Sequence, residues 1–269
     1  MRLYHYVKAD VLKEALNADG FWVKASRPCE FNDMFECTGG VYGSPPHSLV
    51  EEFCVARSDQ ALVASAHGNL AEHVRKWVWK AFFDRKFLGQ GHRISCFTDA
   101  GRMQKYPGSD IRMWAHYANQ GMGVRFEIDT EKLQFLPEAV RYSCEAPKLD
   151  LSTVNHIREL TDFIEDCIIT KHKIWEPEQE ARIIFRGPNE AVCFDPKVKL
   201  HRWLLPLNCV VKIAIGEALL KSSEIHVILQ HIRNVIRGVR PTISIVAAMR
   251  NYNTYDMDYM PIDEFQCKQ

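Results

Sequence analysis

Hydrophobic and polar residues follow two periods along the chain, which predict strands and helices in turn. Apolar positions that recur every three or four residues predict helices, and runs rich in β-branched and aromatic residues predict strands. The clearest helix covers residues 225–236, where an apolar stripe ends before Gly238. Strands are expected at residues 2–6, 21–24, 93–97, 122–128, 138–142, 181–185, 210–215 and 242–247.

Helices are expected in the intervals between these strands. The pattern predicts a short helix over residues 11–16 and another from Ser109 to Tyr117, with Ser109 as its cap. Ser152 is expected to cap a long helix that ends near Lys173. A helical pattern between the second and third strands predicts two more helices at residues 48–88.

This order of elements predicts an α+β fold. The sequence contains neither a Gly-x-Gly-x-x-Gly loop nor a Gly-Lys-Ser/Thr phosphate loop, so Rossmann and P-loop architectures are not expected. We expect a single domain over residues 1–269, in which helices wrap a mixed or split β-sheet. Residues 48–88 would form a helical insertion on one side of it.

Composition and charge narrow the class of protein. Of 269 residues, 46% are hydrophobic and 25% charged, as in an ordinary globular protein. The 34 Lys and Arg residues balance 34 Asp and Glu residues, so the charge of a general nucleic-acid or anionic-membrane binder is missing, although a local basic patch remains open. No stretch approaches the ~20 apolar residues of a membrane span, and the first residues do not form a signal peptide. We therefore expect a cytoplasmic protein with no membrane partner and reduced cysteines.

His5 lies between two tyrosines in the first predicted strand. Alternation places Tyr4 and Tyr6 on one face and His5 with Leu3 on the other. A core histidine with satisfied hydrogen bonds is the more frequent explanation of such a pattern, and a site histidine is the alternative.

A second candidate segment covers residues 31–36. It sets Asn32, Asp33 and Glu36 among large apolar side chains. An Asx turn that docks on the core is the favoured interpretation, because a metal site would need further ligands from elsewhere in the chain.

The third segment, residues 175–182, carries two glutamates close to an arginine. In an extended segment Glu178, Glu180 and Arg182 would share one face. Of two carboxylates roughly 7 Å apart, one can stabilise positive charge while the other receives a proton. The alternative is a solvated strand edge with an ion pair between Glu180 and Arg182.

Two further segments contribute candidates. Ser95, Cys96 and Phe97 lie on one predicted strand, where a buried cysteine is usually inert. On the short helix, Trp114 and Tyr117 share a face from which His116 is turned away. Most aromatic residues in such positions belong to the core.

Taken in order, these segments resemble a widespread bacterial and phage family of unknown function. The shared patterns are His-Tyr near the start, Phe-Asn-Asp-Pro-Phe-Glu, Ser-Cys-Phe, Met-Trp-x-x-Tyr and Trp-x-x-Glu-x-Glu-x-Arg, over about residues 1–250. The chain departs from them at Met34, where Pro is usual, at Ala181, where an aromatic residue is common, and in its helical block at residues 48–88.

The opening of this family is similar to ADP-ribosyltransferases, including toxins that modify DNA. Those enzymes have a histidine on the first strand, then a Leu-rich helix ending in Gly, and a catalytic glutamate on a later strand. The resemblance implies an ADP-ribosyltransferase-like split sheet with NAD as substrate in the cleft between its halves. It also implies a protein or nucleic-acid acceptor, a role as a toxin or anti-phage effector, and an antitoxin or regulator as a further candidate partner.

The same resemblance implies roles for individual residues. Glu180 would stabilise the oxocarbenium-like state that forms when nicotinamide leaves. Glu178 would orient or deprotonate the acceptor, His5 would position the ribose, and Ser95 would support the glutamate or the ribose. The other residues expected at the cofactor are Tyr6, Phe97, Trp114, Tyr117 and Arg182.

Two other classes of function remain open beside the NAD-consuming enzyme, whether transferase or glycohydrolase. A metal-dependent hydrolase or nuclease would hold a divalent cation, and a chelator would stop it. Its ligands would be His5, Asp33, Glu36, His116 and one of Glu178 and Glu180. A non-enzymatic module would bind a nucleotide-like ligand or a partner without turnover. The ordered motifs favour the NAD-consuming enzyme.

Overall fold

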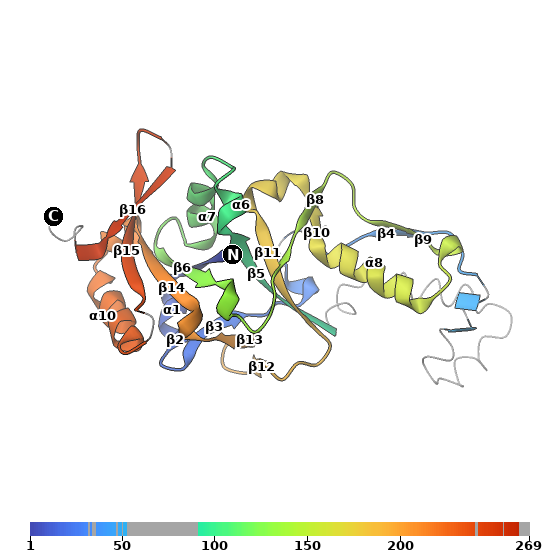
Figure 1. Cartoon of the computed structure of the whole chain (residues 1–269), viewed down its shortest axis with the longest axis horizontal. Helices are drawn as coiled ribbons and strands as arrows, with labels where there is room; N and C mark the ends of the chain where they lie inside the picture. The colour runs from blue at the N-terminus through green and yellow to red at the C-terminus, as the bar shows by residue number, and fades with distance from the viewer. Residues whose placement is uncertain are drawn as a thin grey trace.

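A mixed eight-stranded sheet forms the centre of the protein in a computed structural model (Figure 1). The structure describes residues 1–31, 33, 36–46, 48–49, 51–52, 91–239, 242–254 and 256–263. The strands follow the order β16 (Asp256–Pro261), β15 (Ser244–Asn251), β14 (Val210–Gly216), β6 (Gly123–Asp129), β1 (Arg2–Lys8), β5 (His92–Asp99), β11 (Glu180–Arg186) and β7 (Glu138–Ala139). The β14–β15 pair is parallel and the other pairs are antiparallel. An α+β protein with a mixed sheet was predicted and is confirmed.

The sheet divides between β1 and β5. Along β6, strand β1 is paired over its whole length, from Arg2 to Lys8. Along β5 the pairing is limited to Leu3 with Asp99 and Tyr4 with Thr98. From the fifth residue of the chain onward the two strands separate, so the sheet consists of two halves joined at one end.

A second sheet and two strand pairs surround the main sheet. The second sheet has the order β12 (Val192–Asp195), β13 (Leu200–Leu205), β3 (Gly20–Lys24) and β2 (Leu16–Asn17). The parallel pairs are β10 (Thr170–His172) with β8 (Arg141–Ser143), and β4 (Gly40–Tyr42) with β9 (Lys148–Asp150).

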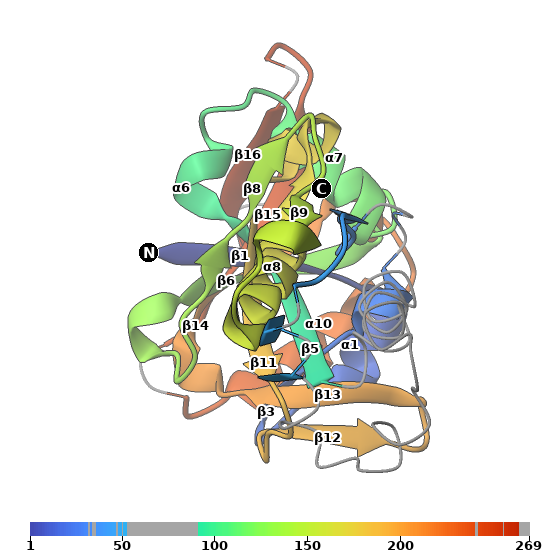
Figure 2. The ribbon, with the colours of Figure 1, turned by 90° about the vertical axis from the view of Figure 1, so that its right-hand side faces the viewer.

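Helices cover both faces of the main sheet. They are α1 (Ala9–Ala15), α6 (Ala100–Met103), α7 (Ser109–Tyr117), α8 (Ile157–Ile169), α9 (Glu217–Leu220) and α10 (Ile225–Ile236). Short 3-10 helices are η1 (Pro28–Glu30), η2 (Thr130–Lys132), η3 (Leu151–Thr153), η4 (Lys173–Glu178) and η5 (Leu207–Cys209). Helix α8 extends to one side with β4 and β9, and Figure 2 views this extension end-on.

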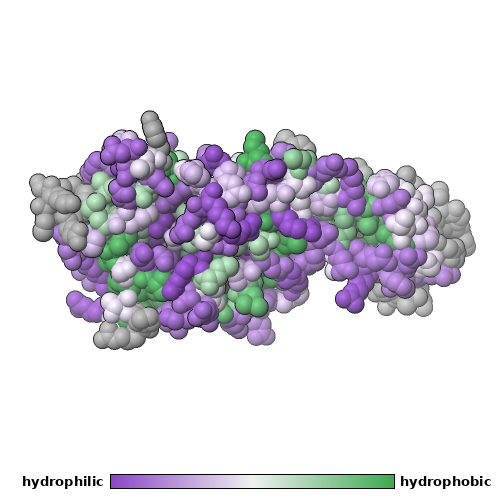
Figure 3. Space-filling model, turned by 45° about the horizontal axis from the view of Figure 1, so that its top comes forward, coloured by the Kyte–Doolittle hydropathy of each residue, from purple (hydrophilic) through white to green (hydrophobic). Residues whose placement is uncertain are grey.

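Apolar packing holds these layers together. On one face of the sheet Phe126 and Ile213 pack with Leu12 of α1 and Ile228 of α10. On the other face Trp114 of α7 belongs to a separate cluster. The space-filling view shows a largely hydrophilic surface broken by separate hydrophobic patches (Figure 3). Within the described ranges, no helix has the length and apolar character that a membrane span requires.

Several predicted boundaries differ from the structure. Gly108, which has a φ of 75°, is the N-cap of α7 in place of Ser109. Ser152 lies in η3, so α8 starts five residues after it and is capped at His156. The helix also ends earlier than predicted, because β10 and η4 occupy the residues up to Glu178. Most of the predicted insertion at residues 48–88 lies outside the described residues.

The packing of α10 gives a first prediction. We expect Ile228→Ala to lower the free energy of unfolding by about 2–5 kcal/mol, because it opens a cavity in the main core. Its neighbour Val227 is 61% exposed, so Val227→Ala should stay within about 0.5 kcal/mol of the parent. Urea unfolding of both variants measures the difference, and equal stabilities would contradict this account of the core.

Candidate active site

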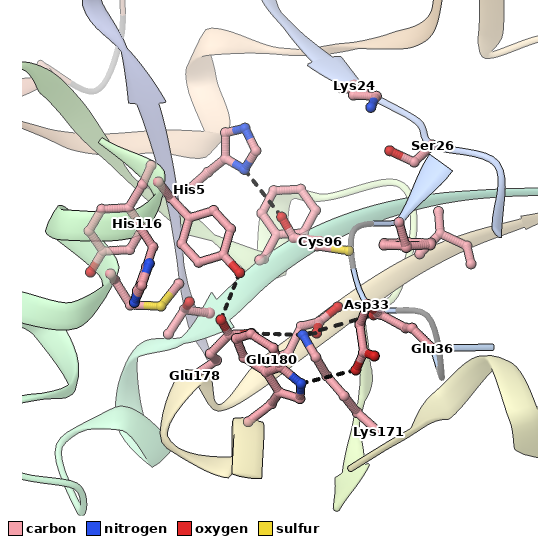
Figure 4. Close-up of a pocket in the computed structure, with 18 of the residues that line it drawn as sticks. His5, Lys24, Ser26, Asp33, Glu36, Cys96, His116, Lys171, Glu178 and Glu180 are labelled. Atoms are coloured by element: carbon pink, nitrogen blue, oxygen red, sulfur yellow. Dashed lines mark hydrogen bonds and ion pairs between the residues drawn. The ribbon is translucent and has the colours of Figure 1, made fainter. Parts of the chain in front are cut away.

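A cavity of about 700 Å³ opens where β1 and β5 separate. Both halves of the sheet line it, together with α7, η4, β10 and the segment that follows β3 (Figure 4). Its aromatic lining residues are Tyr4, Tyr6, Phe31, Phe97, Tyr117 and Trp175. Its acidic lining residues are Glu30, Asp33, Glu36, Glu178 and Glu180. Such a combination of apolar walls and a few convergent polar groups is typical of a small-molecule site.

His5 joins the two halves of the sheet at the point where they separate. Its Nδ1 lies 3.2 Å from the backbone carbonyl oxygen of Cys96. A carbonyl only accepts hydrogen bonds, so Nδ1 carries the proton and donates. Burial lowers the pKa of His5 to about 4, and the ring is therefore neutral near pH 7. In that tautomer Nε2 is a hydrogen-bond acceptor.

Glu180 is held in the cavity by two cations. Its Oε1 accepts from Nε of Arg182 at 2.6 Å and its Oε2 from Nζ of Lys171 at 3.0 Å. Burial alone would raise the pKa of Glu180, but these two charges outweigh it and lower the pKa to about 2. The backbone N–H of Glu180 donates to the Tyr142 hydroxyl at 2.7 Å. Glu180 is therefore an ionised carboxylate near pH 7.

Glu178 binds Lys171, one of the two cations that hold Glu180, from a different element. The extended segment expected around it is absent, because Glu178 ends η4 and Gln179 turns the chain with a φ of 45° before β11 starts. Its Oε2 accepts from Nζ of Lys171 at 2.8 Å, and its Oε1 accepts from the Tyr117 hydroxyl at 2.7 Å. The two glutamates are thus brought together because both bind Lys171, and not because they share one face of a strand.

Lys171 and Glu36 complete a buried charge cluster. Besides the two glutamates, Nζ of Lys171 lies 3.9 Å from Oε1 of Glu36, and that carboxylate also pairs with Arg182. Burial alone would lower the pKa of Lys171, but the three carboxylates raise it well above its usual range. Burial raises the pKa of Glu36, against the attraction of Arg182. Three carboxylates face two cations, so one net negative charge remains when all of them are ionised.

Six of the predicted site residues line the cavity, and three do not. Those that line it are His5, Tyr6, Phe97, Tyr117, Glu178 and Glu180. The other three, Ser95, Trp114 and Arg182, are not among the described residues that line it. Arg182 is fully buried behind Glu180, where its guanidinium also donates to the backbone carbonyl of Ile168. It therefore positions the carboxylates from behind.

Ser95 points to the opposite side of β5. Its hydroxyl donates to the carbonyl oxygen of Lys24 at 2.7 Å and accepts from Nε1 of Trp203 at 2.9 Å. Its side chain thus faces the second sheet and makes no hydrogen bond to Glu180. Of the three residues in the Ser-Cys-Phe pattern, Cys96 and Phe97 are the ones that line the cavity.

Helix α7 turns a different face toward the cavity from the one that the sequence predicts. Met113, His116 and Tyr117 line the cavity, as expected for positions three and four residues apart. Trp114 instead packs against Tyr6, with ring centroids 5.5 Å apart, and donates to the Tyr259 hydroxyl at 3.0 Å. His116 is thus turned toward the cavity, contrary to the prediction, and Trp114 supports the wall from behind.

A buried network fixes the tyrosine wall. The Tyr6 hydroxyl donates to Oδ1 of Asp110 at 2.6 Å, and Nη1 of Arg125 lies 3.2 Å from Oδ2 of the same carboxylate. The guanidinium of Arg125 lies 3.8 Å from the ring centroid of Tyr4 and 4.1 Å from that of Tyr259. These contacts restrict the rings of Tyr4 and Tyr6, so the wall is rigid.

The residues considered for a metal site are engaged in other ways. In the part of the chain that the structure describes, no group of three His, Cys, Asp or Glu residues is arranged to hold a metal ion. Glu36, Glu178 and Glu180 face Lys171 and Arg182, and Asp33 accepts from Nε1 of Trp175 at 3.0 Å. Asn32, which precedes Asp33 in the candidate segment at residues 31–36, lies outside the described residues.

The charge cluster generates a second prediction. Lys171→Met should lower the free energy of unfolding by about 3–5 kcal/mol near pH 7, because three buried carboxylates would then face Arg182 alone. Glu180 has a pKa near 2 in the parent, below its ordinary 4.5, so its pairing stabilises the fold above that range and is lost as the pH falls. In the variant the carboxylates are relieved by protonation.

The difference in the free energy of unfolding between the parent and Lys171→Met should therefore narrow as the pH is lowered from about 7 to about 4. Urea unfolding at several pH values measures it. Lys148→Met is the control, because Lys148 pairs with Glu145 in an exposed position. A difference that is constant over this pH range would contradict the charge cluster as the cause.

Comparisons with known proteins identify one similarity. Residues 113–183 match a family described as "Protein of unknown function (DUF2971)". The matched segment extends from α7 into β11 and includes Tyr117, Lys171, Glu178 and Glu180, whereas His5 lies before it. No curated protein and no solved structure matches the chain. Similarity to a family of unknown function is thus established over this segment, and the likeness to ADP-ribosyltransferases stays a prediction.

Proposed function

We propose that the protein is an NAD-consuming enzyme of the ADP-ribosyltransferase type. One observation supports this above all: His5 on the first strand and Glu180 at the start of β11 line one cavity at the division of a split sheet. The resemblance in the sequence predicts that combination. The cavity volume of about 700 Å³ also lies within the usual range of small-molecule sites, about 300–1,000 Å³.

The reaction needs a stable negative charge beside the ribose. When the bond between C1′ and the nicotinamide nitrogen breaks, nicotinamide leaves as a neutral molecule with the bonding electron pair, and C1′ becomes electron-deficient. An ionised carboxylate stabilises this state. Glu180 supplies it, because its low pKa keeps it charged and Arg182 and Lys171 hold it in place.

The other residues of the cavity bind substrate and acceptor. The neutral ring of His5 offers Nε2 as an acceptor for a ribose hydroxyl, and flat side chains such as Tyr6, Phe97 and Trp175 offer surfaces for nicotinamide. The acceptor nucleophile bonds to C1′ and loses a proton, which Glu178 receives in the same cluster. A water acceptor would make the protein a glycohydrolase, and a macromolecular acceptor would make it a transferase.

The biological setting follows from the resemblance alone. It consists of a protein or nucleic-acid acceptor, a cytoplasmic location, and a role as a toxin or in phage defence with an antitoxin or regulator. A second function is favoured by one specific observation: both oxygens of Glu180 already accept hydrogen bonds from cations. Such a carboxylate is less able to stabilise a reacting centre, which favours a module that binds NAD without cleaving it.

Nicotinamide release tests the enzyme directly. Glu180→Gln keeps the shape of the side chain and the acceptor for Arg182, and it should lower nicotinamide release by about 100- to 1,000-fold. Glu138→Gln is the matched control, because Glu138 pairs with Arg186 and does not line the cavity. Release should be measured with and without cell lysate to detect an acceptor.

Three outcomes of this experiment distinguish the candidate functions. A Glu180→Gln variant as active as the parent, with an unchanged melting temperature, would contradict the role of Glu180. Tight binding of intact NAD by the parent without release would favour the binding module. Release that requires lysate would favour transfer to a macromolecule.

His5 gives a prediction on binding and its pH dependence. Removing one hydrogen bond in His5→Ala should weaken NAD binding about tenfold, whereas His226→Ala, at an exposed position of α10, should not change it. Since the pKa of His5 is about 4, Nε2 is an acceptor above this value and becomes a donor below it. NAD affinity of the parent should be constant from about pH 8 to 5 and fall toward pH 4. Titration calorimetry measures it, and a fall centred near pH 6.5 would be inconsistent with a desolvated His5.

A further inference from the structure

Two lysines line the cavity besides the members of the buried charge cluster. The carboxylates come from the segment that follows β3 and from the segment around η4 and β11, whereas Lys8 and Lys24 contribute from the ends of β1 and β3. Figure 4 shows Lys24 and Ser26 on the far side of Cys96 from Glu178 and Glu180. A ligand that extends from Glu178 and Glu180 past Cys96 therefore reaches Lys24 and Ser26.

The lysines differ from the other charged groups of the cavity in their partners. Glu178 and Glu180 are paired with Lys171, and Glu30 accepts from Nε of Arg27 at 2.8 Å. Lys8 and Lys24, in contrast, make no salt bridge within the described residues. Burial alone would raise the pKa of Glu30, but the hydrogen bonds with Arg27 and then the charge of Lys24 lower it, so Lys24 lies close enough to Glu30 for its charge to act there.

The backbone holds this end of the cavity in place. Ser26 and Ile94 exchange both backbone hydrogen bonds at 2.8 Å, and the carbonyl of Lys24 accepts from Ser95. The hydroxyl of Ser26 makes no hydrogen bond to the described part of the chain and lines the cavity. Lys24 and Ser26 thus offer an ammonium group and a hydroxyl donor on fixed backbone, and Lys8 lines the same cavity from the end of β1.

We propose that Lys8, Lys24 and Ser26 form a subsite for a phosphorylated group of the ligand, and specifically for a diphosphate. A single carboxylate would be neutralised by one lysine, whereas a diphosphate carries enough charge and acceptor oxygens for two lysines and a hydroxyl. The inference rests on the proposed function where it names NAD, whose diphosphate would lie here while its nicotinamide ribose lies beside Glu180. It gives a role to two lysines of the cavity that have no salt-bridge partner among the described residues.

Binding of ADP and adenosine to the full chain tests the subsite without any turnover. Calorimetry should show that the parent binds ADP more tightly than adenosine, and that only ADP affinity falls as salt increases. The double variant Lys8→Met/Lys24→Met should bind ADP at least tenfold more weakly and adenosine as the parent does. Lys13→Met is the control, because Lys13 lies nearby on α1, pairs with Glu224 and does not line the cavity. Lys24→Arg should retain ADP binding.

The outcomes separate this subsite from the proposed enzyme. Equal affinity of the parent for ADP and adenosine, or unchanged ADP affinity in the double variant, would overturn the subsite even if nicotinamide is released. Lysine-dependent ADP binding without any nicotinamide release would support the subsite and count against the enzyme. Since both lysines are exposed, melting temperatures of the variants should match the parent and exclude unfolding as the cause.

Discussion

The loss of pairing between β1 and β5 is the constraint on which the rest of the site depends. Strands that separate in the middle of a sheet leave backbone groups without ladder partners, and such groups are costly unless side chains satisfy them. Here the ring of His5 bonds the exposed carbonyl of Cys96. The hydrogen bond that replaces the ladder also fixes the tautomer of the histidine, so one contact stabilises the fold and defines the chemistry of the cavity.

The buried charges obey a similar logic. An isolated carboxylate at the exposure of Glu180 would take up a proton, whereas Arg182 behind it and Lys171 beside it keep it ionised. The two cations differ in kind, since the planar guanidinium joins Glu36 and Glu180 and the ammonium joins Glu178 to both. The negative end of the cavity is therefore a property of the whole cluster.

Much of the fold could be predicted because periodicity is a local signal. The strand at residues 93–97 and the helix at residues 225–236 were located in this way, and short motifs led to His5 and Glu180. The edge strands β12 and β16 were missed, because few of their side chains are buried and an edge strand carries a weaker hydrophobic signal than a central one. Lys171 was also missed, because a single lysine after an amphipathic helix carries no pattern. The positions of Ser95 and Trp114 depend on which face of an element meets the cavity, and that is decided by tertiary packing.

Helix α8 holds both cations that pair with the buried carboxylates. The carbonyl of Ile168 near its end accepts from Arg182, and Lys171 follows only two residues after its last turn. Both cations of the cluster are thus anchored to the same end of one helix, which also packs against Ile184 of β11 and, further along, against β4 and β9. The position of this one helix end therefore sets where both countercharges lie beside the buried carboxylates.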